Sequence, residues 1–208
     1  MTIEAVTPLR KRLLDVGLCL LALLLLWPVM LGLAVVLLVV QGRPVIFRSE
    51  RMSGPGRAFD LYKFRSMRVA TQDHGVTGGD KSDRITPLGA KMRRWRLDEL
   101  PQIINILRGD MSLVGPRPPA RQYVDAFPAL YAKVLAVPPG LTGLATLHFH
   151  RHEERLLAAC QSAEETHAVY ARRCVPRKAQ LDLMYQRHWS LCLDLKLIWQ
   201  TVWHVLRD

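Results

Sequence analysis

The sequence has few acidic residues, no paired cysteines and no nucleic-acid-binding motif. Each of these features limits the partners or the compartment that the protein can have. Its 18 aspartate and glutamate residues stand against 29 lysine and arginine residues, so the net charge of +11 calls for an anionic partner. The four cysteines show no Cys-x-x-Cys pair and no zinc spacing, which predicts unpaired thiols in a reducing compartment. The basic residues are scattered and do not alternate with aromatic residues, so we expect no nucleic acid among the partners.

One long segment has no charged residue. Residues 16–40, VGLCLLALLLLWPVMLGLAVVLLVV, exceed the roughly 20 apolar residues that a membrane-spanning helix needs. The segment is too long for a cleavable signal peptide and lacks a small-x-small cleavage site at its end. We therefore predict a membrane-bound protein, with an anchor over residues 1–41 and a second domain over residues 42–208.

Two features of the anchor bear on how it enters the membrane. Pro28 lies at the midpoint of the apolar segment, where proline removes a backbone donor and breaks or kinks a helix. Basic residues flank both ends and favour the cytoplasmic side: Arg10, Lys11 and Arg12 before the segment, and Arg43, Arg48 and Arg51 after it. A re-entrant hairpin of two helices, which breaks at Pro28 and leaves by the face that it entered, satisfies both features. A Pro-kinked helix that spans the membrane once is the alternative.

The rest of the chain is typical of a mixed α/β domain with more helix than strand. Residues 42–67 read as two extended segments around a turn at Gly54, Pro55 and Gly56. In the second segment Lys63 and Arg65 are two positions apart, so they share one face of a strand. Two neighbouring cations suit a diphosphate or a lipid phosphate, and a solvated strand face is the alternative.

The stretch RRWRLDELPQ, residues 93–102, carries two adjacent carboxylates, Asp98 and Glu99. Pro101 is tolerated in the first turn of a helix, and Gly109 is placed to end one. The residues between them form one apolar face at helical spacing: Leu100, Ile103, Ile104 and Leu107. A helix is therefore predicted to start near Asp98, where its dipole favours ionised carboxylates. Asp98 is then either a simple N-cap or part of a site that acts on an anion.

A proline-containing loop follows this helix. In GDMSLVGPRP, residues 109–118, Arg117 lies between Pro116 and Pro118, which restrict the backbone and hold the arginine at little entropic cost. A rigid arginine beside a carboxylate pair makes an anion site that faces a nucleophile or a metal ligand. Adjacent carboxylates together with a diphosphate also suit Mg²⁺, so Asp98 and Glu99 are the candidate metal ligands.

Five segments, in this order, carry a resemblance to a known family: KRLLDVGLCLLALLLLWPV, FRSERMSGPGRAFDLYKFRSM, RRWRLDELPQIINILRGDMSLVGPRP, PPGLTGLA and LDLKLIWQTV. The sequence resembles the bacterial monotopic phosphoglycosyl transferases, or bacterial sugar transferases, over nearly its whole length except about residues 148–180. The resemblance implies an enzyme that moves a phosphosugar from a UDP-sugar to a polyprenol phosphate such as undecaprenyl phosphate. It also implies a re-entrant anchor in membrane lipid, with the catalytic domain on the cytoplasmic face of the bacterial inner membrane.

The same resemblance implies roles for individual residues. Asp98 would be the nucleophile that forms an acyl-phosphate, and Glu99 would bind Mg²⁺. Candidates for phosphate or nucleotide contacts are Lys63, Arg65, Arg84 and Arg117, the last held by Pro116 and Pro118. Two alternatives stay open: a one-step transfer with Asp98 as general base, and a membrane-tethered nucleic-acid-binding or scaffold protein. A homodimer is left open as the oligomeric state.

Two later segments have less specific patterns. His148, His150 and His152 alternate, so on a strand they would share a face and could bind a transition metal. A polar loop or a substrate-facing strand is expected there instead. Near the C-terminus an amphipathic helix is predicted, which either lies in the membrane interface or docks on the protein core. Its apolar stripe consists of Leu195, Ile198, Trp199, Val202, Trp203 and Leu206.

Overall fold

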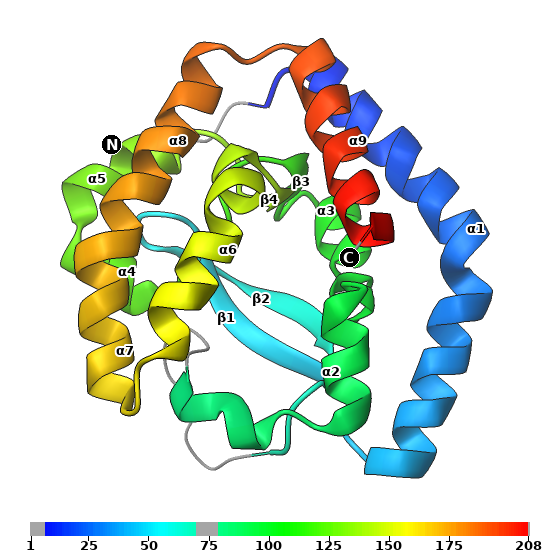
Figure 1. The fold of residues 1–208 in the computed structure, drawn as a ribbon. Helices are drawn as coiled ribbons and strands as arrows, with labels where there is room; N and C mark the ends of the chain where they lie inside the picture. The colour runs from blue at the N-terminus through cyan, green and yellow to red at the C-terminus, as the bar shows by residue number, and fades with distance from the viewer. Residues whose placement is uncertain (1–6, 70–78, 208) are drawn as a thin grey trace.

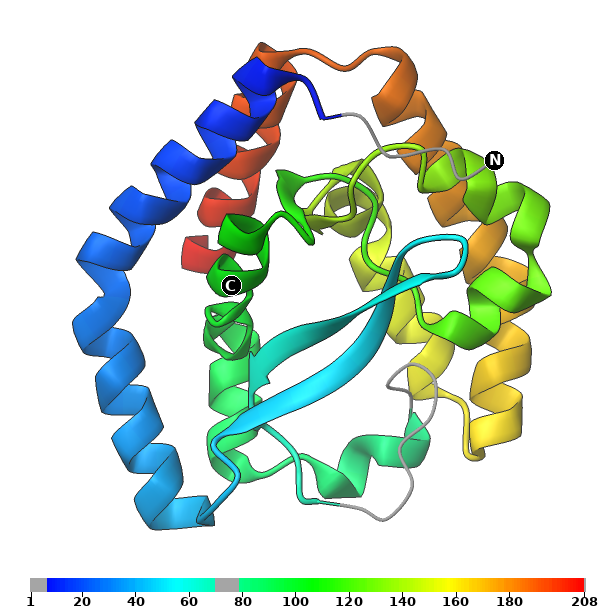
Figure 2. The same cartoon turned by 180° about the vertical axis from the view of Figure 1, so that it is seen from behind.

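The computed structural model describes residues 7–69 and 79–207 and shows a helix-rich mixed α/β fold, as the sequence predicts. One long helix, α1 (Leu9–Gln41), arcs around one side of a body made of shorter elements (Figures 1 and 2). The first elements of the body are β1 (Ile46–Gly54), β2 (Arg57–Phe64), η1 (Gly79–Arg84), α2 (Pro87–Arg94), η2 (Leu97–Glu99), α3 (Gln102–Arg108) and β3 (Ser112–Val114). The others are α4 (Arg121–Ala126), α5 (Pro128–Val134), β4 (Gly140–Thr142), α6 (Leu144–Ala158), α7 (Ala163–Val169), η3 (Tyr170–Cys174), α8 (Val175–Arg187) and α9 (Leu191–Arg207).

Strands β1 and β2 form the antiparallel hairpin that the turn residues predict. Ile46 pairs with Phe64 at the open end, and the chain reverses at Pro55 and Gly56, where Gly56 has a φ of 71°. A positive φ of this kind is readily adopted by glycine, which has no Cβ to clash with the backbone. The hairpin crosses the middle of the body (Figure 2).

A second, smaller sheet fixes the loop that contains Arg117. Strands β3 and β4 pair in parallel. Just beyond β3, Gly115 donates to the Thr142 carbonyl at 2.9 Å, and Gly140 donates to the Pro116 carbonyl at 2.8 Å. A Cβ on Gly140 would lie 2.1 Å from the Gly115 nitrogen, so any other residue would push the two segments apart. The backbone that leads into Arg117 is therefore held by close packing as well as by hydrogen bonds.

Helix α1 is continuous, so the predicted break at Pro28 is corrected to a single curved helix (Figure 1). Proline removes one backbone hydrogen bond, and a helix can absorb that loss by bending when packing holds its flanks. Both halves of α1 are held in this way, because Cys19 packs with Ile106 of α3 and Leu37 packs with Met92 of α2. Among the described residues, α1 is the one helix long and apolar enough to cross a membrane.

Buried polar contacts join both ends of α1 to the body. Near its N-terminal end, Lys11 donates to the Asp194 carboxylate of α9 at 2.8 Å, and both side chains are buried. The same carboxylate accepts from Tyr185 at 2.6 Å and from Trp189 at 3.0 Å, and we call these four residues the Lys11 anchor. At the other end, the Arg65 guanidinium donates to the main-chain carbonyls of residues 41, 42 and 43.

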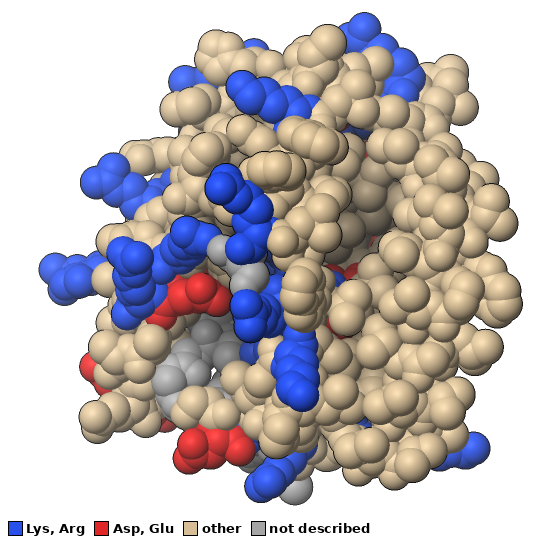
Figure 3. All heavy atoms as spheres, turned by 45° about the vertical axis from the view of Figure 1, so that its right-hand side comes forward, with Lys and Arg blue, Asp and Glu red and all other residues tan. Residues whose placement is uncertain are grey.

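The outer faces of α1 and α9 are apolar and uncovered. In the space-filling view, the surface over α1 carries little charge, whereas lysine and arginine side chains gather over the neighbouring face (Figure 3). Helix α9 docks on the core through Leu197, yet most of its predicted apolar stripe is exposed. The exposed apolar residues include Leu20, Leu24, Leu25, Trp27, Leu31, Val35 and Val39 of α1, and Leu195, Trp199, Val202, Trp203 and Leu206 of α9.

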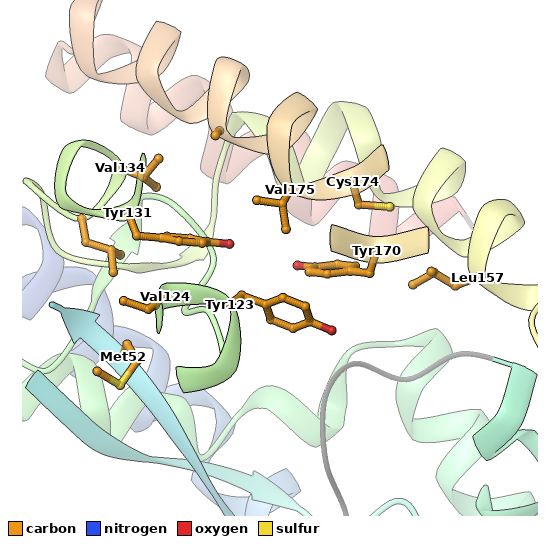
Figure 4. Packing of buried hydrophobic residues seen from close by; sticks show 11 residues of the cluster. Met52, Tyr123, Val124, Tyr131, Val134, Leu157, Tyr170, Cys174 and Val175 are labelled. Atoms are coloured by element: carbon orange, nitrogen blue, oxygen red, sulfur yellow. The ribbon is translucent and has the colours of Figure 1, made fainter. Parts of the chain in front are cut away.

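The largest buried cluster lies on the side of the body away from α1, between α4, α5, η3 and α8 (Figure 4). Tyr123 and Tyr170 are in contact there, with ring centroids 4.6 Å apart, and Val175 and Cys174 pack beside them. All four cysteines of the chain are free, which confirms the prediction of unpaired thiols. This cluster holds α6 and α8 in place behind the hairpin.

Candidate active site

A left-handed turn at Arg96 places the two adjacent carboxylates. Its φ is 52°, and it is the one non-glycine residue with a positive φ in the described ranges. One 3₁₀ turn, η2, then carries Asp98 and Glu99 before α3 begins at Gln102. The predicted helix start is therefore correctly located, although its first turn is 3₁₀ rather than α. Arg96 and Pro101 occupy the capping positions, so the N-cap interpretation of Asp98 is wrong.

Three cations from separate parts of the chain surround Glu99. Its Oε1 accepts from Lys63 of β2 at 3.0 Å and from Arg117 of the loop after β3 at 2.5 Å. Its Oε2 accepts from Arg96 at 2.7 Å. The Glu99 side chain is 8% exposed, whereas the side chains of the cations are 22–34% exposed. We call Glu99 and these three cations the Glu99 cage.

Burial and the cage cations shift the pKa values of the two carboxyl groups differently. Burial alone would raise the pKa of Glu99, but Arg117, Lys63 and Arg96 together hold that pKa well below its usual range. Burial raises the pKa of Asp98, and this rise persists although Lys63 and Arg117 oppose it. Glu99 is therefore held as an anion, and Asp98 is the carboxyl group that binds a proton more readily.

The sequence-predicted phosphate contacts separate into two groups. Lys63 and Arg117 meet at Glu99, and their contacts with phosphate stay a prediction. Arg65 does not join them, because its guanidinium is engaged by carbonyls at the end of α1. Strand β2 ends at residue 64, so the alternation that would align Arg65 with Lys63 stops too early. Arg84, at the end of η1, donates to the Arg68 carbonyl at 3.5 Å and stays a predicted contact.

Two residues of the site were missed by the sequence predictions. Arg96 appeared only as one of several arginines before the carboxylates, and its role depends on a left-handed turn that no local pattern reveals. Gln102 is 1% exposed and lies one helical turn after the carboxylates, next to Pro101. Gln102 follows Glu99 by three residues, a spacing that brings side chains together on a helix. This spacing could have identified Gln102 as a candidate site residue from the sequence.

The donor set fits Mg²⁺ together with a phosphate-bearing substrate. Asp98 and Glu99 are hard oxygen donors, and Mg²⁺ is usually held by one or two carboxylates plus substrate phosphate oxygens. Both Glu99 oxygens accept from cage cations in this structure, so a metal on Glu99 requires at least one cation to move away. Within the described residues, no group of three or more His, Cys, Asp or Glu could hold a metal ion alone.

The three alternating histidines lie on α6, so the expected strand or loop is corrected to a helix. With 3.6 residues per turn, His148 and His152 fall on one side of the helix and His150 on another. His150 approaches Glu154 at 3.3 Å. Burial lowers the pKa of His150, Glu154 opposes this, and two cage arginines lower the pKa further. His152 instead lines a surface cavity of about 400 Å³ between α6 and α8.

Comparison with known proteins identifies the family. The bacterial sugar transferase family model matches residues 6–208. Over 202 residues the chain is 42% identical to the UDP-glucose:undecaprenyl-phosphate glucose-1-phosphate transferase of Xanthomonas campestris pv. campestris, covering 94% of this chain and 38% of that protein. Identity to the Escherichia coli (strain K12) protein of the same name is 36% over 204 residues, covering 96% of this chain and 41% of that protein.

A third relative is named for a different sugar. It is the UDP-N-acetylgalactosamine-undecaprenyl-phosphate N-acetylgalactosaminephosphotransferase of Aeromonas hydrophila, 34% identical over 200 residues, with 94% of this chain and 43% of that protein covered. The chain thus spans about two fifths of the length of these relatives. Because the family model covers almost every residue of the chain, including the whole Glu99 cage, this chain belongs to the bacterial sugar transferase family.

Proposed function

We propose that this protein transfers a sugar 1-phosphate from a UDP-sugar to a polyprenol phosphate such as undecaprenyl phosphate, and that it releases UMP. The three relatives are named for sugar-phosphate transfers that involve undecaprenyl phosphate, which supports this substrate class. The observation that carries the proposal is the buried pair of Asp98 and Glu99 beside three cations. Three positive charges against two carboxylates leave a surplus that suits a diphosphate.

Asp98 is the nucleophile in the proposed reaction. One of its carboxylate oxygens attacks the phosphorus that carries the sugar, and the bond from that phosphorus to the oxygen of UMP breaks. UMP leaves with the electron pair, and the sugar phosphate stays on Asp98 as an acyl-phosphate. An oxygen of the polyprenol phosphate then attacks the same phosphorus and releases the Asp98 carboxylate. The covalent route divides one difficult displacement into two easier ones.

The Glu99 cage prepares the site for the charge of the donor. Lys63, Arg96 and Arg117 have long, partly exposed side chains, so they can exchange a Glu99 oxygen for a phosphate oxygen. When bound, Mg²⁺ supplies further charge compensation at the diphosphate, with Glu99 and Asp98 as its protein ligands. The cations stabilise the departing UMP phosphate, which gains negative charge as its bond breaks.

The pKa of Asp98 gives the proposed reaction an expected pH dependence. A nucleophilic carboxylate must be ionised, and burial raises the pKa of Asp98, with Glu99 adding to the rise against Lys63. The acidic limb of the rate profile should therefore lie above pH ~4, the usual range for aspartate. The same raised pKa would also suit a general base in a one-step transfer, so the two routes must be separated by their intermediates.

The test is UMP release from purified protein in nanodiscs, with a panel of donors that includes UDP-glucose and UDP-N-acetylgalactosamine. With donor alone, we expect stoichiometric UMP and a sugar-phosphate adduct on the peptide that contains Asp98, detected by mass spectrometry. Turnover should begin when polyprenol phosphate is added. If UMP appears only with the acceptor and no adduct is trapped, the one-step route replaces the covalent one. If no donor on the panel releases UMP, the proposed transfer is wrong.

We propose that the anchor, residues 1–41, enters and leaves the bacterial inner membrane by its cytoplasmic face as the single curved helix α1, without a break at Pro28, and that residues 42–208 are the catalytic domain. Support comes from the two ends of α1, which contact the same body through the Lys11 anchor and through Arg65. A helix that spanned the bilayer would place its ends on opposite sides of a hydrocarbon core roughly 30 Å thick. The exposed apolar faces of α1 and α9 would then lie in the same leaflet.

Cysteine labelling tests this topology. Cys192 is the one exposed native thiol, so Cys192→Ser gives a background in which new sites can be read. Leu9→Cys and Arg57→Cys mark the two sides of α1, and an impermeant maleimide should label neither in spheroplasts and both after permeabilisation. Labelling of the Leu9 site alone from outside would show a single span.

A further inference from the structure

One polar side chain beside the Glu99 cage lacks a partner. The amide nitrogen of Gln102 is buried and forms no hydrogen bond, and the residue as a whole is 1% exposed. An unpaired buried donor costs about 1–3 kcal/mol, and native structures keep few of them. Such a group three residues after Glu99 is a candidate to contact a bound ligand.

Helical spacing shows which way Gln102 points. Glu99 ends η2, and Gln102 and Asn105 follow at intervals of three in α3, so the three side chains lie on successive turns. Glu99 contacts Lys63, and the Asn105 side chain accepts from the main-chain nitrogen of Tyr62 at 3.1 Å. These two partners are neighbours on β2. Because Gln102 lies between Glu99 and Asn105 along the chain, we infer that its side chain faces β2 near Lys63.

The polar groups of Glu99 and Asn105, on either side of Gln102 along the chain, already have partners. Both Glu99 oxygens already accept from cage cations. The Asn105 amide donates to the Asp60 carbonyl at 2.8 Å and to Asp110 at 3.1 Å, so these groups are engaged as well. The Gln102 amide and the Lys63 ammonium are both hydrogen-bond donors, so an anionic oxygen would be an acceptor for both.

We propose that the Gln102 amide donates a hydrogen bond to a phosphate oxygen of the bound sugar nucleotide, beside Lys63. The proposal rests on the proposed function and adds a substrate contact to it. Asp98 is one helical turn before Gln102, so a diphosphate held by this amide lies against the attacking carboxylate. Gln102 thereby restrains the donor in the orientation that the displacement requires.

A neutral donor fits this position better than a fourth cation, because Lys63, Arg96 and Arg117 already place three positive charges at Glu99. The amide adds a directional hydrogen bond without adding a like charge beside them.

Gln102→Met tests the proposal, because methionine keeps the length of the side chain and removes the donor. Titration with UDP and Mg²⁺, read by calorimetry on protein in nanodiscs, should show affinity about 10- to 100-fold weaker than wild type, the range for a hydrogen bond to a charged group. The melting temperature without nucleotide should stay equal or rise, since an unpaired buried amide is gone. Gln102→Glu should bind UDP more weakly still, because its carboxylate repels phosphate.

Gln180→Met, on the exposed side of α8, is the matched control and should bind UDP like wild type. Wild-type UDP affinity in Gln102→Met overturns the proposal, and so does a lower melting temperature, which would reveal a structural partner. The assay needs no turnover, so it is independent of the transfer reaction. If wild type binds UDP and never releases UMP from a UDP-sugar, the proposed function fails while the Gln102 contact is still measured.

Discussion

The Lys11 anchor and the Glu99 cage are both buried ion clusters, but they are built in opposite ways. In the anchor, one cation meets one carboxylate, and Tyr185 and Trp189 donate to that same carboxylate. The Lys11 and Asp194 side chains are 5% and 1% exposed. The charges balance, and both carboxylate oxygens have donors. Such a cluster joins α1 to α9 and has no capacity left for a ligand.

The cage has more positive than negative charge and remains accessible. Lys63, Arg96 and Arg117 all contact Glu99, while the exposed fractions of their side chains reach 34%. Gln102 adds a donor without an acceptor. Balanced charges and full burial therefore distinguish the cluster that joins α1 to α9 from the cluster for which we propose an anionic ligand. The following changes test this distinction, from the largest expected effect to the smallest.

Asp98→Asn should lower the proposed transfer rate by several orders of magnitude, because it removes the charge of the proposed nucleophile. The melting temperature should change little, since the cage cations keep Glu99 as their partner. UMP release and the melting curve are measured on the same nanodisc sample. Asp125→Asn, on the exposed side of α4, is the control and should change neither quantity. Near wild-type turnover in Asp98→Asn would contradict the role of Asp98.

Asp194→Asn makes the same chemical change in the Lys11 anchor and should act on stability. Removing one partner of a buried ion pair leaves Lys11 uncompensated and typically lowers the free energy of unfolding by about 3–5 kcal/mol. Denaturant or thermal unfolding in a mild detergent measures this loss. The double change Lys11→Met with Asp194→Asn should recover part of it, because neither member of the pair is then left charged without the other. If Asp194→Asn is as stable as wild type, the anchor does not hold α1.

Asp182→Asn extends the comparison to a buried carboxyl group outside both clusters. Burial raises the pKa of Asp182 to about 7, although Lys178 opposes the rise. A raised pKa means that the folded state favours the protonated form, so this contribution to stability is present below pH ~4 and is lost as pH rises through 7. The variant should match wild type near pH 4 and be more stable by roughly 2–4 kcal/mol above pH 7. Equal stability at pH 8 would contradict the raised pKa.

Arg117→Lys keeps the positive charge of the cage and removes the planar guanidinium. A lysine ammonium cannot form the two parallel hydrogen bonds that a guanidinium offers to phosphate, so kcat/KM for the donor should fall by about 10- to 100-fold. Arg121→Lys is the control, since the Arg121–Glu50 pair is exposed on both sides and surface pairs contribute little. Equal kinetics for Arg117→Lys and wild type would show that charge alone suffices.

Features specified by short-range patterns were predictable. The hairpin of β1 and β2 follows from Gly56 at the turn, and the helix after Pro101 follows from its apolar face and from Gly109, whose φ of 94° ends it. To predict that Arg117 lies near Asp98 and Glu99, the family motifs were needed as well. The loop that carries Arg117 is held by the parallel pairing of β3 with β4, which comes from a later part of the chain.

Features set by distant partners were not predictable. Arg65 donates to main-chain carbonyls 22 to 24 positions earlier in the sequence. The residues next to Arg65 in the sequence do not indicate these partners. Helix α1 continues through Pro28 because its two halves pack against α3 and α2. The residues around Pro28 do not indicate these contacts. The alternation of His148, His150 and His152 is typical of a strand, but the segment that contains them folds as helix α6.

Helix α1 carries its polar contacts at both ends and its packing along both halves, so it is an integral part of the fold rather than a removable tether. A chain that starts at residue 42 would leave the Asp194 carboxylate without its cation and would uncover Ile103 and Ile106 of α3. For this protein that shortening should yield aggregates, whereas mutating the outward-facing leucines of α1 to polar residues offers a route that preserves the inner face.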